Sequence, residues 1–146
     1  MATIERKADA QWSGDIRNGN GTLTSPSGIL KETPYSFRAR FEGAPGTNPE
    51  ELIAAAHAGC FTMAFSGVLT QAGHAPRNLA TEATLGMDSV PGGFKISSMH
   101  LNVRGSVDGI DQAQFEAMAH QAEQGCPVSN ALRGNLTITV HATLES

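Results

Sequence analysis

The sequence predicts an α+β fold in which mainly antiparallel sheets surround a long central helix. Three features indicate this class: short apolar runs separated by glycine and proline near the N-terminus, a long alanine-rich helical segment after Asn48, and a strictly alternating segment at the C-terminus. A length of 146 residues suits a single domain, 1–146, and the 40% hydrophobic and 16% charged composition indicates a globular chain.

The N-terminal part predicts an antiparallel meander. Glycines and prolines separate runs at Leu23, Ile29–Leu30 and Tyr35–Glu42. Apolar and polar residues alternate in the last run, which is the period of a half-buried strand and would turn Arg40 away from the core of its sheet.

The strongest helix start in the chain follows at Asn48. Asn48 suits the N-cap, Pro49 the first helical position and Glu51 the third position of a capping box, so a helix should run to about Gly73. Three- and four-residue steps predict a buried stripe on this helix. The stripe comprises Leu52, Ile53, Ala56, Cys60, Met63, Ala64, Gly67 and Val68.

A hairpin and a helical segment complete the chain. The turn Pro91-Gly92-Gly93 should join a strand through Ala83, Leu85 and Met87 to a second arm, Phe94–Val107, whose change of phase predicts a bulge near Ser97–Ser98. A helix should run from Asp111 to about Gln124, burying Phe115, Met118, Ala119 and Ala122, and close at Gly125. A short helix Pro127–Leu132 and a final strand with Leu136, Ile138, Val140, Ala142 and Leu144 facing inward should follow.

The charge distribution argues against two classes of partner. The formal net charge is −4, and the ten Lys and Arg residues are scattered, so neither nucleic acid nor an anionic membrane is expected as a partner. The N-terminus has no apolar signal core, and polar residues and glycines interrupt the apolar stretch at 52–69. We therefore expect a cytoplasmic protein that needs no cofactor.

The two cysteines are the candidate reactive groups. They are too far apart in sequence for a CxxC redox motif or a zinc-knuckle pair, and disulfides that form in the cytoplasm are usually redox-active. Cys60 lies deep in a helix, where burial would raise its pKa and make it inert unless a cation lies nearby. The alternative interpretation is that Cys60 is only a small apolar residue of the core. Cys126 lies at an N-cap position, where N–H groups stabilise a thiolate, or it simply tolerates that position.

Four segments carry a resemblance to a known family. Arg40-Phe-Glu-Gly43, Asn48-Pro-Glu-Glu-Leu52, Ala55-Ala-His-Ala-Gly-Cys60-Phe61 and Gly125-Cys-Pro-Val-Ser129 resemble the osmotically inducible protein C and organic hydroperoxide resistance family, almost end to end. The position of Arg40 resembles the osmotically inducible branch.

This resemblance implies a thiol peroxidase of the oxidative and osmotic stress responses that reduces organic hydroperoxides, and hydrogen peroxide more weakly. It implies that Cys60 is the peroxidatic cysteine, that Cys126 resolves it as a disulfide, and that Arg40 and Glu50 activate Cys60. It also implies a homodimer and a dithiol reductant such as a dihydrolipoyl protein.

Helix geometry adds a constraint on this site. Glu50 and Cys60 are ten residues apart, which is about 15 Å along one helix. We therefore do not expect one Arg40 side chain to contact both Glu50 and Cys60 of the same helix. Two such helices packed antiparallel would bring Glu50 and Arg40 of one chain beside Cys60 of the other, which predicts an obligate, intertwined homodimer.

Several alternatives remain open. Glu50 is also a suitable first-turn carboxylate, and Arg40 a solvated strand residue. His57 shares the face of Cys60, so it is a candidate base or, with Cys60 and Cys126, a zinc ligand, although such histidines more often pack at an interface. The whole chain is alternatively a redox sensor or ligand-binding module with little turnover, or a structural domain with two inert thiols.

Overall fold

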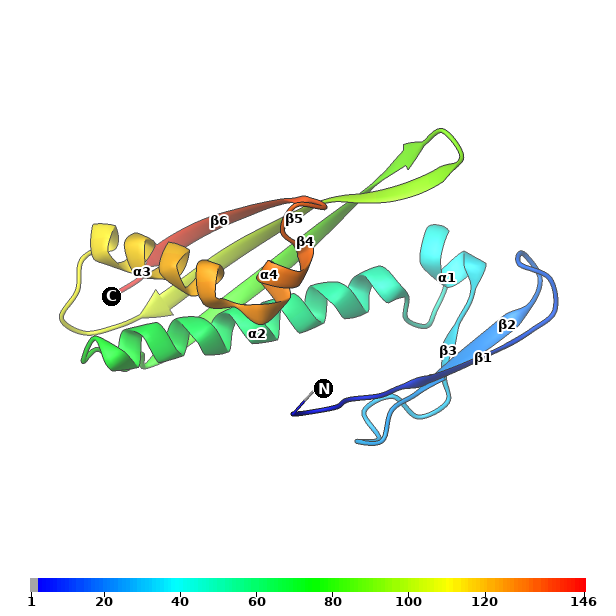
Figure 1. Ribbon diagram of the computed structural model, residues 1–146, viewed down its shortest axis with the longest axis horizontal. Coiled ribbons are helices and arrows are strands. Elements are labelled where there is room, and N and C mark those ends of the chain that lie inside the picture. Colours follow the sequence, from blue (N-terminus) through cyan, green and yellow to red (C-terminus); the bar gives the residue numbers. More distant parts are fainter. Residues whose placement is uncertain (1–2) are drawn as a thin grey trace. The chain divides into compact units, whose positions relative to one another are not determined.

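The computed structural model describes residues 3–146 and has a mixed α+β architecture with two small sheets (Figure 1). The chain divides into two compact units, Met1–Leu52 and Ile53–Ser146.

The first unit contains the expected antiparallel meander. Its strands β1 (Asp9–Ser13), β2 (Asn20–Thr24) and β3 (Thr33–Tyr35) pair in that order. Trp12 and Tyr35 lie opposite Gly21 on either side, and their rings are 5.5 Å apart. A Cβ at Gly21 would collide with both rings, so glycine is what lets the aromatic pair cover this strand.

Two expectations for this unit are wrong. Ile29–Leu30 lies in a turn region, and Ile29 is 84% exposed. The run Tyr35–Glu42 does not form a strand, because β3 ends at Tyr35 and a short helix, α1 (Phe37–Phe41), follows. The hydroxyl of Ser36 caps this helix by accepting the N–H of Ala39 at 3.1 Å, a local signal that the alternating pattern concealed.

The second unit contains a mixed three-stranded sheet. Strands β4 (Asn78–Val90) and β5 (Gly93–Ser106) form the predicted hairpin, and β6 (Thr137–Leu144) pairs with β5 in parallel. Gly86 pairs with Ser98 while Met87 pairs with Ile96. Ser97 therefore has no partner residue on β4, which confirms the predicted bulge.

The three helices predicted from the sequence are confirmed to within a few residues at each end. Helix α2 is Pro49–Gln71, and the Oδ1 atom of Asn48 accepts the N–H of Glu51 at 2.8 Å. Helix α3 is Gln112–Gly125, with a capping box between Asp111 and Gln114. Helix α4 is Pro127–Leu132.

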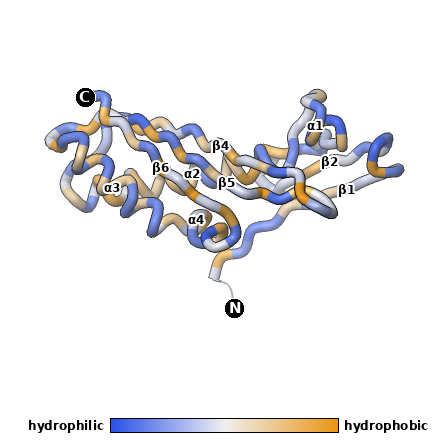
Figure 2. The backbone as a smooth tube through the Cα atoms, turned by 90° about the horizontal axis from the view of Figure 1, so that it is seen from above, coloured by the Kyte–Doolittle hydropathy of each residue, from blue (hydrophilic) through white to orange (hydrophobic). Residues whose placement is uncertain are grey.

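The core of the second unit lies between the sheet and these helices. Phe61 and Phe65 of α2 meet Phe115 of α3, and the Phe65 and Phe115 rings are 4.9 Å apart. They pack against one face of the sheet, and buried and more exposed residues alternate along β5 and β6. The hydropathy of the backbone trace also varies along these strands (Figure 2). The inward residues are Met99, Leu101, Val103 and Ala142.

The buried stripe predicted for α2 is partly wrong. Met63 is 78% exposed, and Ala56 and Gly67 are also exposed. The fully buried positions are instead His57, Phe61, Phe65 and Leu69. Apolar residues occur on every side of α2, so periodicity alone did not identify which side faces the core.

Candidate active site

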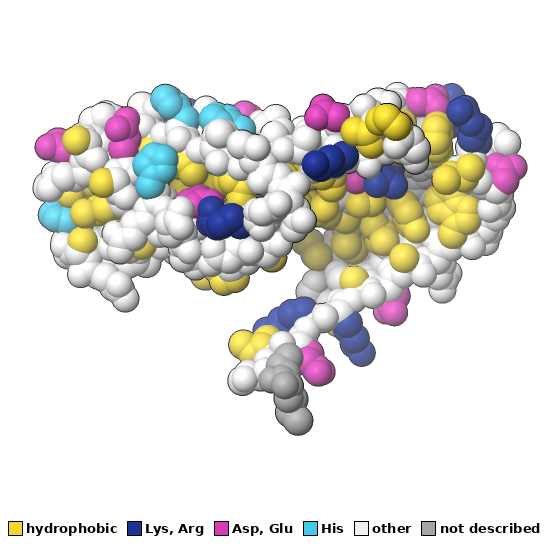
Figure 3. Space-filling view, turned by 45° about the horizontal axis from the view of Figure 1, so that its top comes forward, with side chains coloured by type: hydrophobic (Ala, Val, Ile, Leu, Met, Phe, Trp, Pro, Cys, Tyr) yellow, Lys and Arg dark blue, Asp and Glu magenta, His cyan; other side chains and the backbone are white. Residues whose placement is uncertain are grey.

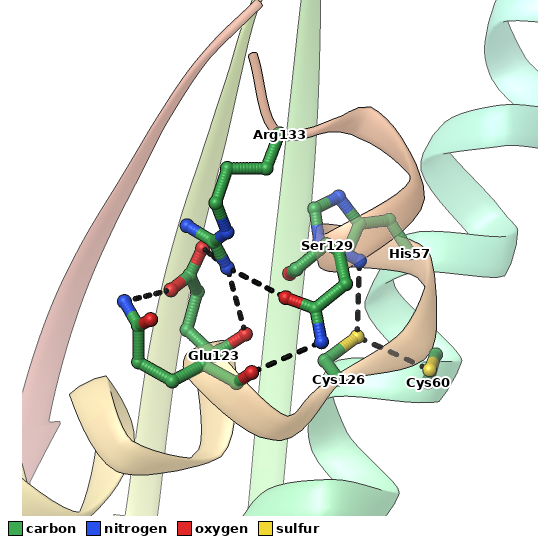
Figure 4. A network of polar contacts seen from close by, with 8 residues as sticks. His57, Cys60, Glu123, Cys126, Ser129 and Arg133 are labelled. Carbon is green, nitrogen blue, oxygen red and sulfur yellow. Dashed lines mark hydrogen bonds and ion pairs between the residues drawn. The ribbon is translucent and has the colours of Figure 1, made fainter.

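The two cysteines meet inside the second unit. Cys60 projects from α2, Cys126 lies between α3 and α4, and their Sγ atoms are 3.1 Å apart as free thiols (Figure 4). Cys126 is fully buried, whereas Cys60 is only half-buried. The thiols are therefore close enough to form a disulfide after a small movement, and Cys60 is the more accessible of the two.

The backbone explains the position of Cys126. This residue is both the C-cap of α3 and the N-cap of α4, in an extended conformation, and Pro127 begins the next helix. The N–H of Ser129 donates to Cys126 Sγ at 3.5 Å. The N-cap position expected from the sequence is confirmed, and it directs a backbone donor at the sulfur.

The electrostatics of Cys60 are less favourable to reaction. Burial raises the pKa of the Cys60 thiol, and the neighbouring Cys126 also raises it, although a hydrogen bond from the Val128 backbone opposes them. A thiolate reacts faster than a thiol. A positive charge placed beside Cys60 would oppose this rise and favour the thiolate.

Arg40 and Glu50 form a bidentate pair in the first unit. The Nε and Nη2 atoms of Arg40 each donate to a carboxylate oxygen of Glu50 at 2.9 Å. The Arg40 side chain is 41% exposed and that of Glu50 only 12%. This geometry fixes the plane of the guanidinium group and leaves part of it available to a further partner.

Glu51 does not complete the capping box expected at the start of α2. Its carboxylate instead accepts a hydrogen bond from the hydroxyl of Thr47 at 2.8 Å.

The four site residues expected from the sequence form two close pairs. Arg40 and Glu50 pair in the first compact unit, and Cys60 and Cys126 lie in contact in the second.

A polar network near Cys126 was missed by sequence reasoning. His57 Nε2 lies 2.6 Å from Ser129 Oγ, and Arg133 pairs with the buried carboxylate of Glu123 at 2.9 Å (Figure 4). Burial lowers the pKa of His57, opposed by Glu123. Ser129 belongs to the Gly125-Cys-Pro-Val-Ser129 segment, but nothing in the sequence indicated that it would meet a residue of α2.

The zinc hypothesis gains no support from side-chain positions. Within residues 3–146, no three His, Cys, Asp or Glu side chains are grouped as a metal site would require.

An apolar pocket surrounds Arg40 in the first unit. Its volume is about 320 Å³, which is within the range of small-ligand sites. Its lining residues are Trp12, Ile16, Tyr35, Ser36, Phe37, Arg40, Phe41 and Pro49. The pocket thus combines aromatic and aliphatic walls with one guanidinium group.

Comparisons with known proteins give a consistent picture. Residues 41–141 match the family model described as OsmC-like protein. The chain is 46% identical to the Escherichia coli (strain K12) protein named Peroxiredoxin OsmC over 93% of this chain and 95% of that protein. It is 38% identical to an Organic hydroperoxide resistance protein of Xanthomonas axonopodis pv. citri over 67% of this chain and 68% of that protein.

Solved structures show the same fold. The crystal structure of the organic hydroperoxide resistance protein OhrB of Bacillus subtilis aligns with a TM-score of 0.69 and 26% identity, covering 93% of this chain and 97% of that one. An organic hydroperoxide resistance protein OsmC from Legionella pneumophila aligns with a TM-score of 0.70 and 26% identity, covering 98% and 99% of the two chains.

Proposed function

Because the chain belongs to the OsmC-like protein family, whose named relatives indicate a peroxidase-like role, we propose that it is a cysteine-based thiol peroxidase. Its substrates are organic hydroperoxides and, more weakly, hydrogen peroxide. The observation that carries this proposal is the pair of free thiols 3.1 Å apart, one half-buried and one fully buried.

The proposed cycle has three steps. The Cys60 thiolate attacks the distal peroxide oxygen, the O–O bond breaks, and the alcohol leaves after taking up a proton, which gives a Cys60 sulfenic acid. The Cys126 thiolate then attacks the Cys60 sulfur, the S–O bond breaks, and the hydroxyl leaves as water with a second proton. A dithiol such as a dihydrolipoyl group reduces the resulting disulfide by exchange and is itself oxidised.

The accessibility of the two thiols supports this choice of roles. A peroxide can reach the half-buried Cys60, whereas Cys126 is fully enclosed and can meet only a sulfur already beside it. The Ser129 N–H also donates to the Cys126 sulfur at 3.5 Å, which helps to hold this sulfur in place beside Cys60.

Arg40 supplies the missing positive charge in this proposal. Its guanidinium would lower the pKa of Cys60 and polarise the peroxide, while Glu50 holds it in one orientation. Glu50 and Cys60 are ten residues apart on α2, about 15 Å of helix, so we assign Arg40 and Glu50 to the Cys60 of a partner chain.

The exposed surface of α2 supports an intertwined homodimer. Ala55, Gly59, Met63 and Gly67 recur at four-residue steps along it, and all are exposed. By length and composition this helix also has the properties of a membrane span, with a mean hydropathy of 1.7 and 22% of the window buried. The opposite side of α2 is part of a protein core. We therefore propose that the protein is cytoplasmic and that a second copy of the chain, not lipid, covers these four exposed residues.

In this proposal residues 1–146 act as one domain whose two units are completed by dimerisation. The active species should therefore elute from size-exclusion chromatography with about twice the 15.3 kDa chain mass, because neither site is complete in one chain. Light scattering on the same peak checks the mass. A monomer that retains full peroxidase activity would disprove the composite site.

The apolar pocket beside Arg40 suits the organic part of a hydroperoxide. Replacing Ile16, which is 72% exposed, with serine removes apolar surface without disturbing a core. We expect kcat/KM for cumene hydroperoxide to fall by about threefold to tenfold, with little change for hydrogen peroxide, which has no apolar group to bind. Ile29→Ser is the matched control, since Ile29 is 84% exposed and outside the pocket lining. Equal losses on both substrates would contradict the pocket assignment.

A redox sensor with the same cysteine pair is the second candidate function, favoured by the complete burial of Cys126. Peroxide consumption in excess dithiothreitol distinguishes the two. A peroxidase consumes many equivalents of cumene hydroperoxide per chain because the dithiol reduces its disulfide after each turnover, whereas a sensor whose disulfide is not recycled consumes one equivalent and stops.

A further inference from the structure

A second contact joins the two elements that carry the cysteines. His57 lies three residues before Cys60 on α2, and Ser129 lies three residues after Cys126 in α4. The His57 Nε2 and Ser129 Oγ atoms are 2.6 Å apart, beside the 3.1 Å contact between the two sulfurs (Figure 4). Helix α2 and the start of α4 thus contact each other twice within about one turn, once through the two free thiols and once through a hydrogen bond.

His57 is an unfavourable residue for an ordinary core position. Its side chain is fully buried, and its Nδ1 atom has no hydrogen-bond partner among the residues that the structure describes. Histidine side chains elsewhere lie at the surface, as Figure 3 shows, and His100, His120 and His141 are exposed. An apolar ring would fill the site of His57 without burying an unpaired nitrogen, so the contact with Ser129 is what histidine adds here.

Two other residues, Asn130 of α4 and its C-cap residue Arg133, attach this segment to a different helix. Arg133 pairs with Glu123 and also donates to the Glu123 carbonyl at 3.3 Å, and Asn130 donates to the Gln124 carbonyl at 3.0 Å. Glu123 and Gln124 belong to α3. The His57–Ser129 hydrogen bond instead ties α4 to α2, the helix that carries Cys60.

We propose that His57 and Ser129 are positioning residues for disulfide formation. A helix of six residues gains little stability from its own hydrogen bonds, so tertiary contacts hold it in place, and the His57–Ser129 bond is the side-chain hydrogen bond that holds it to α2. The bond keeps Cys126 Sγ directed at Cys60 after the Cys60 sulfur has gained oxygen, when the direct contact between the thiols is lost. The proposal rests on the peroxidase cycle above and concerns its second step.

The first test separates the two chemical steps in His57→Leu and Ser129→Ala. Reduced protein is mixed rapidly with one equivalent of cumene hydroperoxide, and peroxide loss and disulfide appearance are timed separately. We expect peroxide loss to remain within about twofold, since both side chains are fully buried. Disulfide formation should slow about fivefold to tenfold, the typical effect of one buried hydrogen bond. Slower resolution should also increase Cys60 sulfinic acid in excess hydroperoxide, detected by intact mass.

Conservative variants distinguish positioning from packing. The amide of His57→Gln and the hydroxyl of Ser129→Thr can each restore the hydrogen bond, so both should recover most of the resolution rate. The double variant His57→Leu/Ser129→Ala should be no slower than either single one, because the pair acts as a unit. If Gln and Thr are as slow as Leu and Ala, or if Leu and Ala resolve at the wild-type rate, the proposal is wrong.

A second measurement needs no peroxide. The equilibrium constant for forming the Cys60–Cys126 disulfide in glutathione buffers should fall about fivefold to tenfold in Ser129→Ala, or roughly 20–30 mV, because the thiols are less well aligned. Ser129→Ala is the milder change and carries the test if His57→Leu does not fold. If Ser129→Ala shifts this equilibrium constant but the wild type consumes no hydroperoxide, the positioning role is supported and the peroxidase function is refuted. If Ser129→Ala has the wild-type equilibrium constant and the wild-type rate of disulfide formation, only the positioning role is refuted.

Discussion

Cys60→Ser should lower hydroperoxide reduction by about 10⁴-fold or more, to the background rate of the dithiol reductant, because the serine hydroxyl does not ionise and cannot accept oxygen as sulfur does. Burial raises the pKa of Cys60, so the wild-type rate should increase with pH as the thiolate forms. Steady-state reduction of cumene hydroperoxide with dithiothreitol measures the loss. Full activity in Cys60→Ser would refute the peroxidase mechanism.

Cys126→Ser is the matched control, since it removes the other sulfur of the pair. This variant should still consume one equivalent of hydroperoxide at nearly the wild-type rate and then accumulate a Cys60 sulfenic acid, which dimedone traps. If both variants lose the first step equally, the roles assigned from accessibility are not distinct.

The elements that the sequence predicted well are those with local signals. The Asn48 cap and the helix starts expected near Asp111 and at Pro127 each depend on residues within about one turn of the helix start, and the structure has all three. The bulge at Ser97 followed from a phase change that would otherwise have turned apolar side chains to the solvent face.

The failures involve competition between signals or contacts distant in sequence. Ser36 capped a helix where alternation indicated a strand, so Arg40 lies on α1 instead of on a strand face. Helix α2 is apolar on all sides, and its buried side was decided by tertiary packing. The His57–Ser129 bond joins residues 72 positions apart, and no periodicity in the chain reports such a contact.

The second large effect concerns Arg40. Arg40→Ala should lower kcat/KM for cumene hydroperoxide by about 10²–10³-fold, because both the stabilisation of the thiolate and the polarisation of the peroxide are lost. The pH at which activity rises should move upward, since a positive charge beside a thiol lowers its pKa and removing it has the opposite effect. Arg40→Lys should recover only part of the rate, because it keeps the charge without the bidentate pair to Glu50.

Arg38→Ala is the matched control for this loss of charge. Arg38 lies on the same short helix, its side chain is 71% exposed, and its contact with Glu42 is a 3.7 Å surface pair. Its removal should leave activity nearly unchanged. If Arg38→Ala and Arg40→Ala lose similar amounts of activity, the change in net charge explains the loss, and a specific role for Arg40 is contradicted.

A heterodimer decides which chain supplies Arg40. One chain carries Cys60→Ser and the other Arg40→Ala, and two affinity tags isolate the mixed species. If the sites are composite, the Cys60 of the second chain meets the Arg40 of the first, and the heterodimer has one intact site and about half of the wild-type activity. Both sites would be broken if Arg40 and Cys60 acted within one chain, so activity near that of the Cys60→Ser homodimer would refute the composite arrangement. The ten-residue separation of Glu50 and Cys60 along α2 favours the first result, because a rigid helix keeps the two side chains apart.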